Sequence, residues 1–225
     1  MADHDSLQIW ESIYQAGQRN NYPWDNVVSF VFRNAPKDRP RDQVSIVEVG
    51  FGTASNLWFA AREGFAVSGV EGSETAVEYA RNKFSEEGLT GDLRVGDFTK
   101  LPFADDSFDL AIDRAALCCI GRKSHIRAIS EIERVLKPGG KFQYNTYADS
   151  HSSYRTGLLG PDGLRIGIDG GTLKGIGPIY CTSRSDIEEF FADWKLIKVE
   201  RKEVADMLDV SGEVHAEWLV LAEKQ

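Results

Sequence analysis

The segment IVEVGFGTASN, residues 46–56, joins a run of β-forming residues to a helical pattern through a turn that contains two glycines. Gly50 permits a tight turn, and Gly52 allows the backbone to approach a ligand closely. The backbone amides at the start of the following helix would present partial positive charge to that ligand. Because glycines also punctuate turns that bind nothing, the segment predicts a nucleotide-like ligand only in combination with other residues.

Four acidic residues stand at or just after the ends of predicted strands: Glu48, Glu71, Asp97 and Asp113. The carboxyl ends of parallel strands meet at one edge of an α/β sheet, which is where such folds bind ligands. Carboxylates gathered there would attract a cationic ligand and would repel the phosphates of a dinucleotide. The dinucleotide fingerprint also requires a third glycine where this chain has Ser55. An NAD(P)-dependent oxidoreductase is therefore the less favoured alternative, and a cofactor-binding module without catalysis is a third hypothesis.

Strand-like and helix-like patterns alternate along the middle of the chain, which predicts a parallel sheet covered by helices on both faces. The predicted strands are residues 44–49, 65–71, 92–97, 107–113 and 141–147, and the predicted helices are residues 56–64, 73–88 and 124–140. A helix at 184–194 is followed by two strands, 195–204 and 214–224, which have no helix between them and should pair antiparallel. The sequence thus predicts an α/β protein with a doubly wound, Rossmann-like, seven-stranded and mostly parallel sheet whose last strand is antiparallel.

We expect one domain over residues 1–225, because a chain of this length can form one well-buried core. Its parts are an N-terminal helical cap (1–43), a cofactor-binding core (44–147), a glycine-rich cover loop (148–183), and a C-terminal helix with the antiparallel strand pair (184–225). Apolar residues at helical spacing on both sides of Pro23 predict two helices in the cap. Tyr14, Tyr22 and Trp24 lie in this cap. We expect the cap and the cover loop to close the side of the site at the ends of the predicted strands 107–113 and 141–147.

Composition and charge argue against several classes of protein. The formal net charge is −9 and the basic residues are scattered, so nucleic acid is not an expected partner. No run approaches the roughly 18 apolar residues of a membrane helix, and the acidic N-terminus is unlike a signal peptide, which predicts a soluble, cytoplasmic protein without a membrane partner. Cys118, Cys119 and Cys181 have neither a disulfide-framework nor a zinc-ligand spacing, so no metal site is predicted. We expect a monomer or a homodimer.

Together these motifs resemble the class I S-adenosylmethionine-dependent methyltransferases. Glu48-Val49-Gly50-Phe51-Gly52 is similar to the first motif of that family, an acid followed by glycines, although Ala54 stands where many members have a third glycine. LPFADDSFDLAID (101–113) and ERVLKPGGKF (133–142) resemble the family's fourth-strand approach and its turn into strand five. The resemblance implies S-adenosylmethionine as the cofactor and transfer of its methyl group, by in-line displacement, to oxygen or nitrogen of a small-molecule acceptor.

The resemblance also implies roles for residues at the strand ends. Glu71 stands where the family holds the ribose hydroxyls with an acid. Asp97 would accept from the adenine amine, and Phe98 would lie against the adenine ring. Asp113 would hold the methionine ammonium through water or face the acceptor. The predicted cofactor-binding residues are Tyr14, Glu48, Gly50, Gly52, Thr53, Asn56, Glu71, Gly72, Ser73, Asp97, Phe98 and Asp113.

A general base is needed if the acceptor is a hydroxyl, whereas the methyl donor is already activated. His125 is predicted to lie at the start of a helix near the ligand edge, where the helix dipole would keep it neutral. His151 lies in the predicted cover loop. These two histidines and Asp113 are the predicted catalytic residues, and a surface or capping role is the alternative for each histidine. His215 is expected to face outward or to pack in the last strand.

Overall fold

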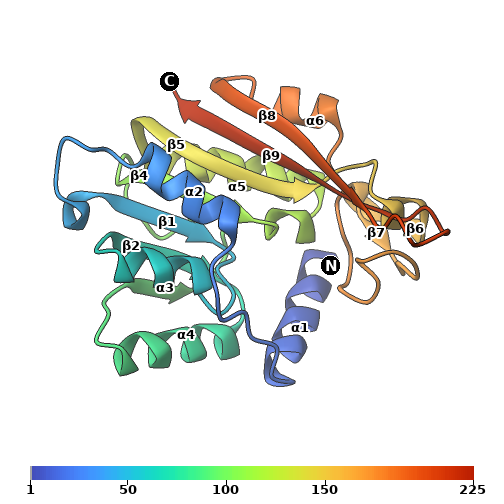
Figure 1. The fold of residues 1–225 in the computed structure, drawn as a ribbon, viewed down its shortest axis with the longest axis horizontal. Coiled ribbons are helices and arrows are strands. Elements are labelled where there is room, and N and C mark those ends of the chain that lie inside the picture. The colour runs from blue at the N-terminus through green and yellow to red at the C-terminus, as the bar shows by residue number, and fades with distance from the viewer. Residues whose placement is uncertain (1) are drawn as a thin grey trace.

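The computed structural model describes residues 2–225, with side chains from residue 6 onward. Its centre is a seven-stranded sheet in the order β3-β2-β1-β4-β5-β9-β8 (Figure 1). These strands are β1 Ser45–Val49, β2 Ala66–Glu71, β3 Asp92–Val95, β4 Phe108–Arg114, β5 Leu136–Tyr147, β8 Trp194–Ala205 and β9 Val214–Lys224. Strands β1 to β5 pair in parallel, and β9 lies antiparallel between β5 and β8. The predicted α/β fold with an antiparallel last strand is confirmed.

Helices cover both faces of the sheet. They are α1 Ala2–Gln15, α2 Asp25–Asn34, α3 Ser55–Arg62, α4 Glu74–Glu86, α5 Arg122–Val135 and α6 Arg184–Phe190. Apolar side chains of α2, α3 and α4, among them Leu57 and Phe84, pack with those of β1 to β4 in one core. Helices α5 and α6 pack on the opposite face in a second core, to which they contribute Ile132 and Phe190. The strand ends are therefore held between two separate apolar layers.

The N-terminal cap consists of two helices on either side of Pro23, as predicted. Helix α1 lies beyond the carboxyl ends of the strands, apart from the sheet (Figure 1). Glu11 anchors α1 to the start of α4, because its carboxylate accepts from Ser73 Oγ and Thr75 Oγ1, each at 2.5 Å. The anchor holds one face of α1 over the ends of β1 and β2, where Tyr14 approaches the turn after β1.

The helix after β4 ends earlier than predicted. The sequence pattern predicts a helix that includes Leu136 and stops at Pro138-Gly139-Gly140, but α5 ends at Val135 and β5 begins at Leu136. Pro138 disfavours helical backbone angles at Lys137, and Leu136 instead pairs with Phe108 of β4. The buried Leu136 therefore belongs to the sheet.

The segment between β5 and α6 is folded, although its sequence shows no clear period. It contains the antiparallel strands β6 Leu158–Leu159 and β7 Arg165–Ile166 and the 3-10 turns Ser152–Arg155 and Pro161–Gly163; two further 3-10 turns are Arg41–Gln43 and Leu117–Cys119. Elements this short leave no hydrophobic period to read. Buried Ile168, Leu173 and Ile179 pack with Cys118 and Cys119, which gives the segment a small core of its own.

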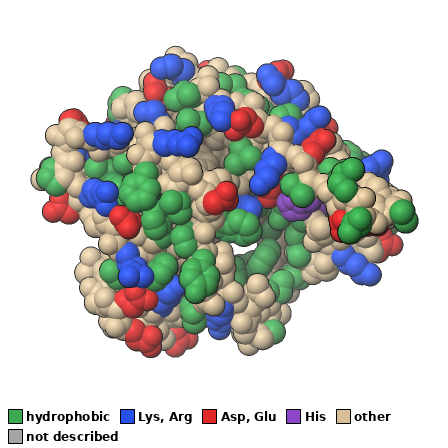
Figure 2. All heavy atoms as spheres, viewed as in Figure 1, with side chains coloured by type: hydrophobic (Ala, Val, Ile, Leu, Met, Phe, Trp, Pro, Cys, Tyr) green, Lys and Arg blue, Asp and Glu red, His purple; other side chains and the backbone are tan. Residues whose placement is uncertain are grey.

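The surface shows a hollow and no single basic patch on the face drawn in Figure 2. Lys and Arg side chains lie among Asp and Glu side chains there, and hydrophobic side chains line the hollow in the middle of the face (Figure 2). No helix in the described part of the chain is long and apolar enough to cross a membrane.

Candidate functional site

A cavity of about 160 Å³, here called the smaller cavity, lies between α1 and the carboxyl ends of β1, β2 and β4. Tyr14 comes from α1, Gly50 from the turn after β1, and Phe98 from the segment after β3. Glu71 and Gly72 come from the end of β2. Five predicted cofactor-binding residues are thus brought to one cavity. Its full lining is Ser6, Leu7, Trp10, Tyr14, Gly50, Glu71, Gly72, Phe98, Arg114, Ala115, Ala116, Cys119 and Ile120.

The turn after β1 requires glycine at two positions. Gly50 has φ +62° and Gly52 has φ +54°, a left-handed conformation that residues with a Cβ rarely adopt. A Cβ at Gly52 would lie 2.6 Å from the Tyr14 hydroxyl oxygen, and a Cβ at Gly50 would collide with the Ala116 side chain. Ala54, at the position where the motif lacks its third glycine, also has a left-handed backbone, with φ +58°. The loop therefore keeps its shape despite the alanine.

Glu71 is held in a fixed orientation at the end of β2. Its Oε2 accepts from the Gly52 amide at 2.8 Å, and its Oε1 accepts from the Ser73 amide at 2.9 Å. The side chain is buried, and desolvation raises its pKa. Each carboxylate oxygen has a further lone pair, so Glu71 can accept from two neighbouring hydroxyls of a ribose.

Three predicted cofactor-binding side chains have structural partners. Ser73 caps α4, since its Oγ accepts an amide of the first turn at 3.1 Å. Thr53 Oγ1 donates to the Asn20 carbonyl at 3.0 Å, and Asn56 Oδ1 accepts from the Trp24 amide at 3.0 Å. Thr53 and Asn56 thus tie the segment between α1 and α2 to the core. The structure does not support the predicted contacts of Thr53 and Asn56 with the cofactor, because both side chains already hydrogen-bond to the segment between α1 and α2.

Glu48 is buried beneath the turn after β1. Its Oε1 accepts from Asn56 Nδ2 at 2.7 Å, while its Oε2 has no partner among the described residues. Desolvation raises the pKa of Glu48 to about 8, against the opposing effect of the Asn56 hydrogen bond. Glu48 is therefore largely protonated at neutral pH. The expectation that it presents negative charge to a ligand is corrected, because burial favours its neutral form.

Asp113 and Asp97 serve turns. Asp113 is fully buried, and its Oδ1 accepts from the Ala116 and Leu117 amides at 2.8 and 3.1 Å. Desolvation raises the pKa of Asp113 to about 7. Its predicted catalytic role is corrected, because a carboxylate buried under this turn does not reach an acceptor. Asp97 is exposed and its Oδ1 accepts from the Thr99 amide at 2.7 Å, so its contact with adenine stays a prediction.

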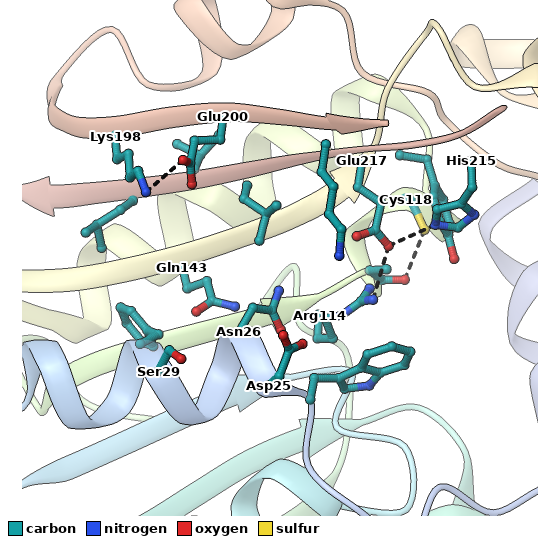
Figure 3. Close-up of a pocket in the computed structure, with 18 of the residues that line it drawn as sticks. Asp25, Asn26, Ser29, Arg114, Cys118, Gln143, Lys198, Glu200, His215 and Glu217 are labelled. Atoms are coloured by element: carbon teal, nitrogen blue, oxygen red, sulfur yellow. Dashed lines mark hydrogen bonds and ion pairs between the residues drawn. The ribbon is translucent and has the colours of Figure 1, made fainter. Parts of the chain in front are cut away.

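A larger cavity of about 780 Å³ lies between α2 and the strands β5, β9 and β8 (Figure 3). At one end it is lined by Trp10, Arg114, Ala115 and Cys119, which also line the smaller cavity. The two cavities therefore adjoin at the turn after β4. A molecule in one cavity can meet a molecule in the other only at this shared wall.

The cap and the cover segment both contribute to the wall of the larger cavity. Trp24 comes from the cap, and Ile176 comes from the segment between β5 and α6. Of the other two aromatic residues predicted to lie there, Tyr14 lines the smaller cavity and Tyr22 is 75% exposed. Trp24 lies under the guanidinium of Arg114, whose Cζ is 3.9 Å from the indole centroid.

The two predicted catalytic histidines are not among the described residues that line either cavity. His125 is fully buried, with its Nε2 2.7 Å from the Tyr144 hydroxyl and its ring stacked on Phe190, and desolvation lowers its pKa to about 3. His151 is buried too, and its Nδ1 accepts from the Ser153 amide at 3.0 Å. Desolvation and a neighbouring histidine lower the pKa of His151 to about 4. Both catalytic assignments are corrected, because these rings are packed away from any acceptor.

Three polar residues that line the larger cavity, Arg114 from β4 and His215 and Glu217 from β9, contact one another. Arg114 Nη2 and His215 Nε2 lie 3.1 and 3.2 Å from the same oxygen, Glu217 Oε1 (Figure 3). From the sequence we expected His215 to face outward or to pack in the last strand, and neither Arg114 nor Glu217 was singled out. The sequence did show that His215 and Glu217 lie on one face of the last strand, because they are two residues apart. This places them in the cavity only once it is known that β9 lies beside β5.

The core of the chain also matches known proteins. Residues 47–143 match a family model described as a methyltransferase domain. This part of the chain is similar to the class I S-adenosylmethionine-dependent methyltransferases. The matched part begins in β1 and ends in β5, so it includes the glycine turn and Glu71.

Two curated relatives and one solved structure show how far the similarity extends. The demethylmenaquinone methyltransferase of Tropheryma whipplei (strain Twist) is 36% identical over 98 residues, 43% of this chain and 38% of that protein. A sterol 4-C-methyltransferase of Caenorhabditis elegans is 31% identical over 103 residues, 45% of this chain and 30% of that protein. The chain thus matches less than two fifths of the length of either relative. A solved methyltransferase of Methanosarcina mazei shares the fold, with a TM-score of 0.70, 18% identity, and coverage of 90% of this chain and 98% of that one.

The smaller cavity offers groups that suit S-adenosylmethionine. Glu71 provides two carboxylate oxygens for a ribose diol, and Phe98 provides a ring for the adenine. Trp10 and Tyr14, with ring centroids 5.7 Å apart, offer aromatic faces, which favour a sulfonium. The glycine turn keeps side chains out of the same space.

Proposed function

We propose that the chain transfers the methyl group of S-adenosylmethionine to a small-molecule acceptor in the larger cavity. The observation that carries this proposal is the wall that the two cavities share, formed by Trp10, Arg114, Ala115 and Cys119. A donor in the smaller cavity and an acceptor in the larger cavity would meet at this wall.

The cofactor would lie with its nucleoside end at β2 and β3. Glu71 would accept from the ribose hydroxyls, and Phe98 would lie against the adenine. The methionine end would then point toward Ala115 in the shared wall, which is where the acceptor approaches. S-adenosylmethionine supplies an activated methyl group, so the protein mainly has to align the acceptor and exclude water.

Helix α1 would exclude water from the reaction. The Trp10 indole N–H donates to Cys119 Sγ at 3.3 Å across the shared wall. Glu11, bound to Ser73 and Thr75, fixes the same helix to the start of α4. The volume of the smaller cavity, about 160 Å³, is below the range usual for small-molecule sites, so we expect α1 to release these contacts and move outward when the cofactor enters.

The relatives widen the range of acceptor atoms. The sequence led us to expect oxygen or nitrogen, whereas the relatives are named as a demethylmenaquinone methyltransferase and a sterol 4-C-methyltransferase, so carbon joins the candidates. The volume of about 780 Å³ lies within the range usual for small-molecule sites. This size supports a metabolite as the acceptor.

Release of S-adenosylhomocysteine in the presence of phenols, quinols, sterols and amines tests the proposal. At least one acceptor class should give turnover above the acceptor-free rate. Trp24→Ala, which opens the wall of the larger cavity, should lower turnover and leave the affinity for S-adenosylhomocysteine unchanged. Tyr22→Ala is the matched control, because Tyr22 is exposed in the same segment. Cofactor binding without turnover on any acceptor would favour the binding module without catalysis.

A further inference from the structure

A row of polar side chains runs from Arg114, in the wall shared by the two cavities, to His151 in the cover segment. His151 Nε2 is 3.2 Å from His215 Nδ1, His215 Nε2 is 3.2 Å from Glu217 Oε1, and Arg114 Nη2 is 3.1 Å from the same oxygen. Figure 3 shows Arg114, Glu217 and His215 pointing toward one another. The row joins β4, β9 and the cover segment at the edge of the wall shared with the cofactor cavity.

The proton on His151 can be placed from its hydrogen bonds. Its Nδ1 accepts from the Ser153 amide, so Nδ1 carries no proton. A neutral imidazole then has its proton on Nε2. That nitrogen faces Thr172 Oγ1 at 3.1 Å and His215 Nδ1 at 3.2 Å, and it must donate to them. His151 is therefore a donor that positions His215 and is not a proton acceptor.

The proton on His215 follows from the same reasoning. Its Nδ1 faces two donors, the His151 Nε2–H and the Thr172 hydroxyl at 2.8 Å. The Nδ1 lone pair is therefore engaged, and the proton of neutral His215 lies on Nε2, directed at Glu217. Tyr147 packs edge-on against the ring and holds its orientation. Glu217 is thus the member of the row whose lone pairs remain open to the cavity.

Glu217 is charged although its side chain is only 10% exposed. Burial opposes ionisation, but hydrogen bonds from His215 and the positive charge of Arg114 outweigh burial and lower the pKa of Glu217. Both contacts use Oε1. A carboxylate held in this way can accept a hydrogen bond from a hydroxyl that enters the cavity.

Arg114 lines the cavity beside Glu217. Its side chain is 9% exposed, and its Nε is enclosed by protein atoms without a hydrogen-bond partner within the described residues. The guanidinium cannot turn away, because it stacks on Trp24 and is bound to Glu217. One wall of the cavity therefore offers a fixed positive charge and a hydrogen-bond acceptor side by side.

Aromatic and apolar side chains also line the larger cavity. They include Trp10, Trp24, Tyr147, Cys118 and Ile176. Aromatic side chains favour a planar ring through offset stacking and edge contacts. The site thus combines a planar apolar space with one polar pair, which is the pattern of a phenol.

We propose that the acceptor is a phenol-like molecule whose hydroxyl lies between Glu217 and Arg114, with Glu217 taking its proton. The inference rests on the proposed methyltransferase function and names its acceptor class. The O–H bond breaks and its proton goes to the Glu217 carboxylate. The oxygen forms the bond to the methyl carbon, and the electron pair of the sulfur–carbon bond returns to sulfur. The positive charge of Arg114 stabilises the negative charge that develops on the oxygen.

Binding of 4-nitrophenol tests the inference, because the phenol and phenolate forms of this probe differ in colour. The probe is titrated into protein saturated with S-adenosylhomocysteine, and the ratio of its two forms is read at a fixed pH. Glu217→Gln removes a negative charge beside the hydroxyl and should raise the phenolate-to-phenol ratio at least about tenfold. Arg114→Met removes the positive charge and should lower that ratio by a similar factor. The two variants should shift the phenolate-to-phenol ratio in opposite directions. A single variant that folds is therefore enough to test the inference.

Glu200→Gln is the matched control, because Glu200 lines the same cavity near Lys198 and away from Arg114 (Figure 3). Its probe ratio should equal that of the wild type. Equal ratios in wild type and Glu217→Gln, or no binding of the probe, would overturn the inference. Loss of S-adenosylhomocysteine affinity in Arg114→Met without a change in the ratio would assign Arg114 to the cofactor carboxylate and would also overturn it. Calorimetry with S-adenosylhomocysteine on the same samples separates these outcomes from a failure of the proposed function itself.

Discussion

Replacing Glu71 by Gln should weaken cofactor binding and also destabilise the fold. In the structure each carboxylate oxygen accepts one backbone amide, Gly52 through Oε2 and Ser73 through Oε1. An amide side chain has only one accepting oxygen. One buried N–H therefore loses its partner in Glu71→Gln, at a cost of about 1–3 kcal/mol in the free energy of unfolding.

The loss in cofactor affinity follows from the same geometry. The ribose would lose a hydrogen bond to a charged group, which contributes about 1.5–3 kcal/mol. This corresponds to a rise in the Kd for S-adenosylhomocysteine of about 10- to 150-fold. Isothermal calorimetry gives the Kd, and denaturant titration gives the stability. Glu74→Gln is the control, because Glu74 is exposed in the first turn of α4 and should leave both quantities unchanged. A folded Glu71→Gln protein whose Kd stays within about twofold of wild type would refute the role of Glu71.

Three further predictions concern the turn, the cap and the buried acid. Gly52→Val should abolish binding of S-adenosylhomocysteine in calorimetry while the protein still melts cooperatively. The left-handed backbone and the Tyr14 hydroxyl leave no room for a side chain at this position. Normal binding by the variant would show that the glycine only forms the turn. Deletion of residues 2–22 should leave a folded core without turnover, and full release of S-adenosylhomocysteine by the truncated protein would place the acceptor site elsewhere. Relative to wild type, Glu48→Gln should gain about 3 to 4 kcal/mol of stability between about pH 5 and about pH 8 in denaturant titrations. The folded state holds the Glu48 proton up to a pKa of about 8, so wild type loses this stabilisation as pH rises from 4.5 through about 8, and equal effects at both pH values would contradict the burial argument.

The parts of the site that depend on local sequence were predictable. Gly50 and Gly52 adopt the left-handed backbone of the turn that their spacing indicates, and Glu71 and Phe98 follow their strands at the same edge of the sheet. The hydrophobic periods of the strands and helices also predicted the order of these elements along the chain, including the antiparallel strand pair at its end. The boundary between α5 and β5 was missed, because Leu136 suits both elements and its pairing with Phe108 decides between them.

The acceptor side could not be read from local sequence. His215 and Glu217 meet Arg114 only because β9 inserts between β5 and β8. His125 looks like a helix-start histidine in the sequence, but Phe190 from α6 stacks on it. Thr53 is likewise taken up by Asn20, which lies 33 residues away. Long-range packing of this kind assigns a polar side chain to the core or to the cavity, and a single sequence does not contain that information.

Calorimetric titration with S-adenosylhomocysteine, alongside NAD, tests the central claim most directly. The smaller cavity offers Glu71 for a ribose diol and aromatic faces for the sulfonium end of the cofactor. We expect saturable binding of S-adenosylhomocysteine at one site per chain and no heat of binding with NAD. Saturable binding of NAD with no response to S-adenosylhomocysteine would contradict it.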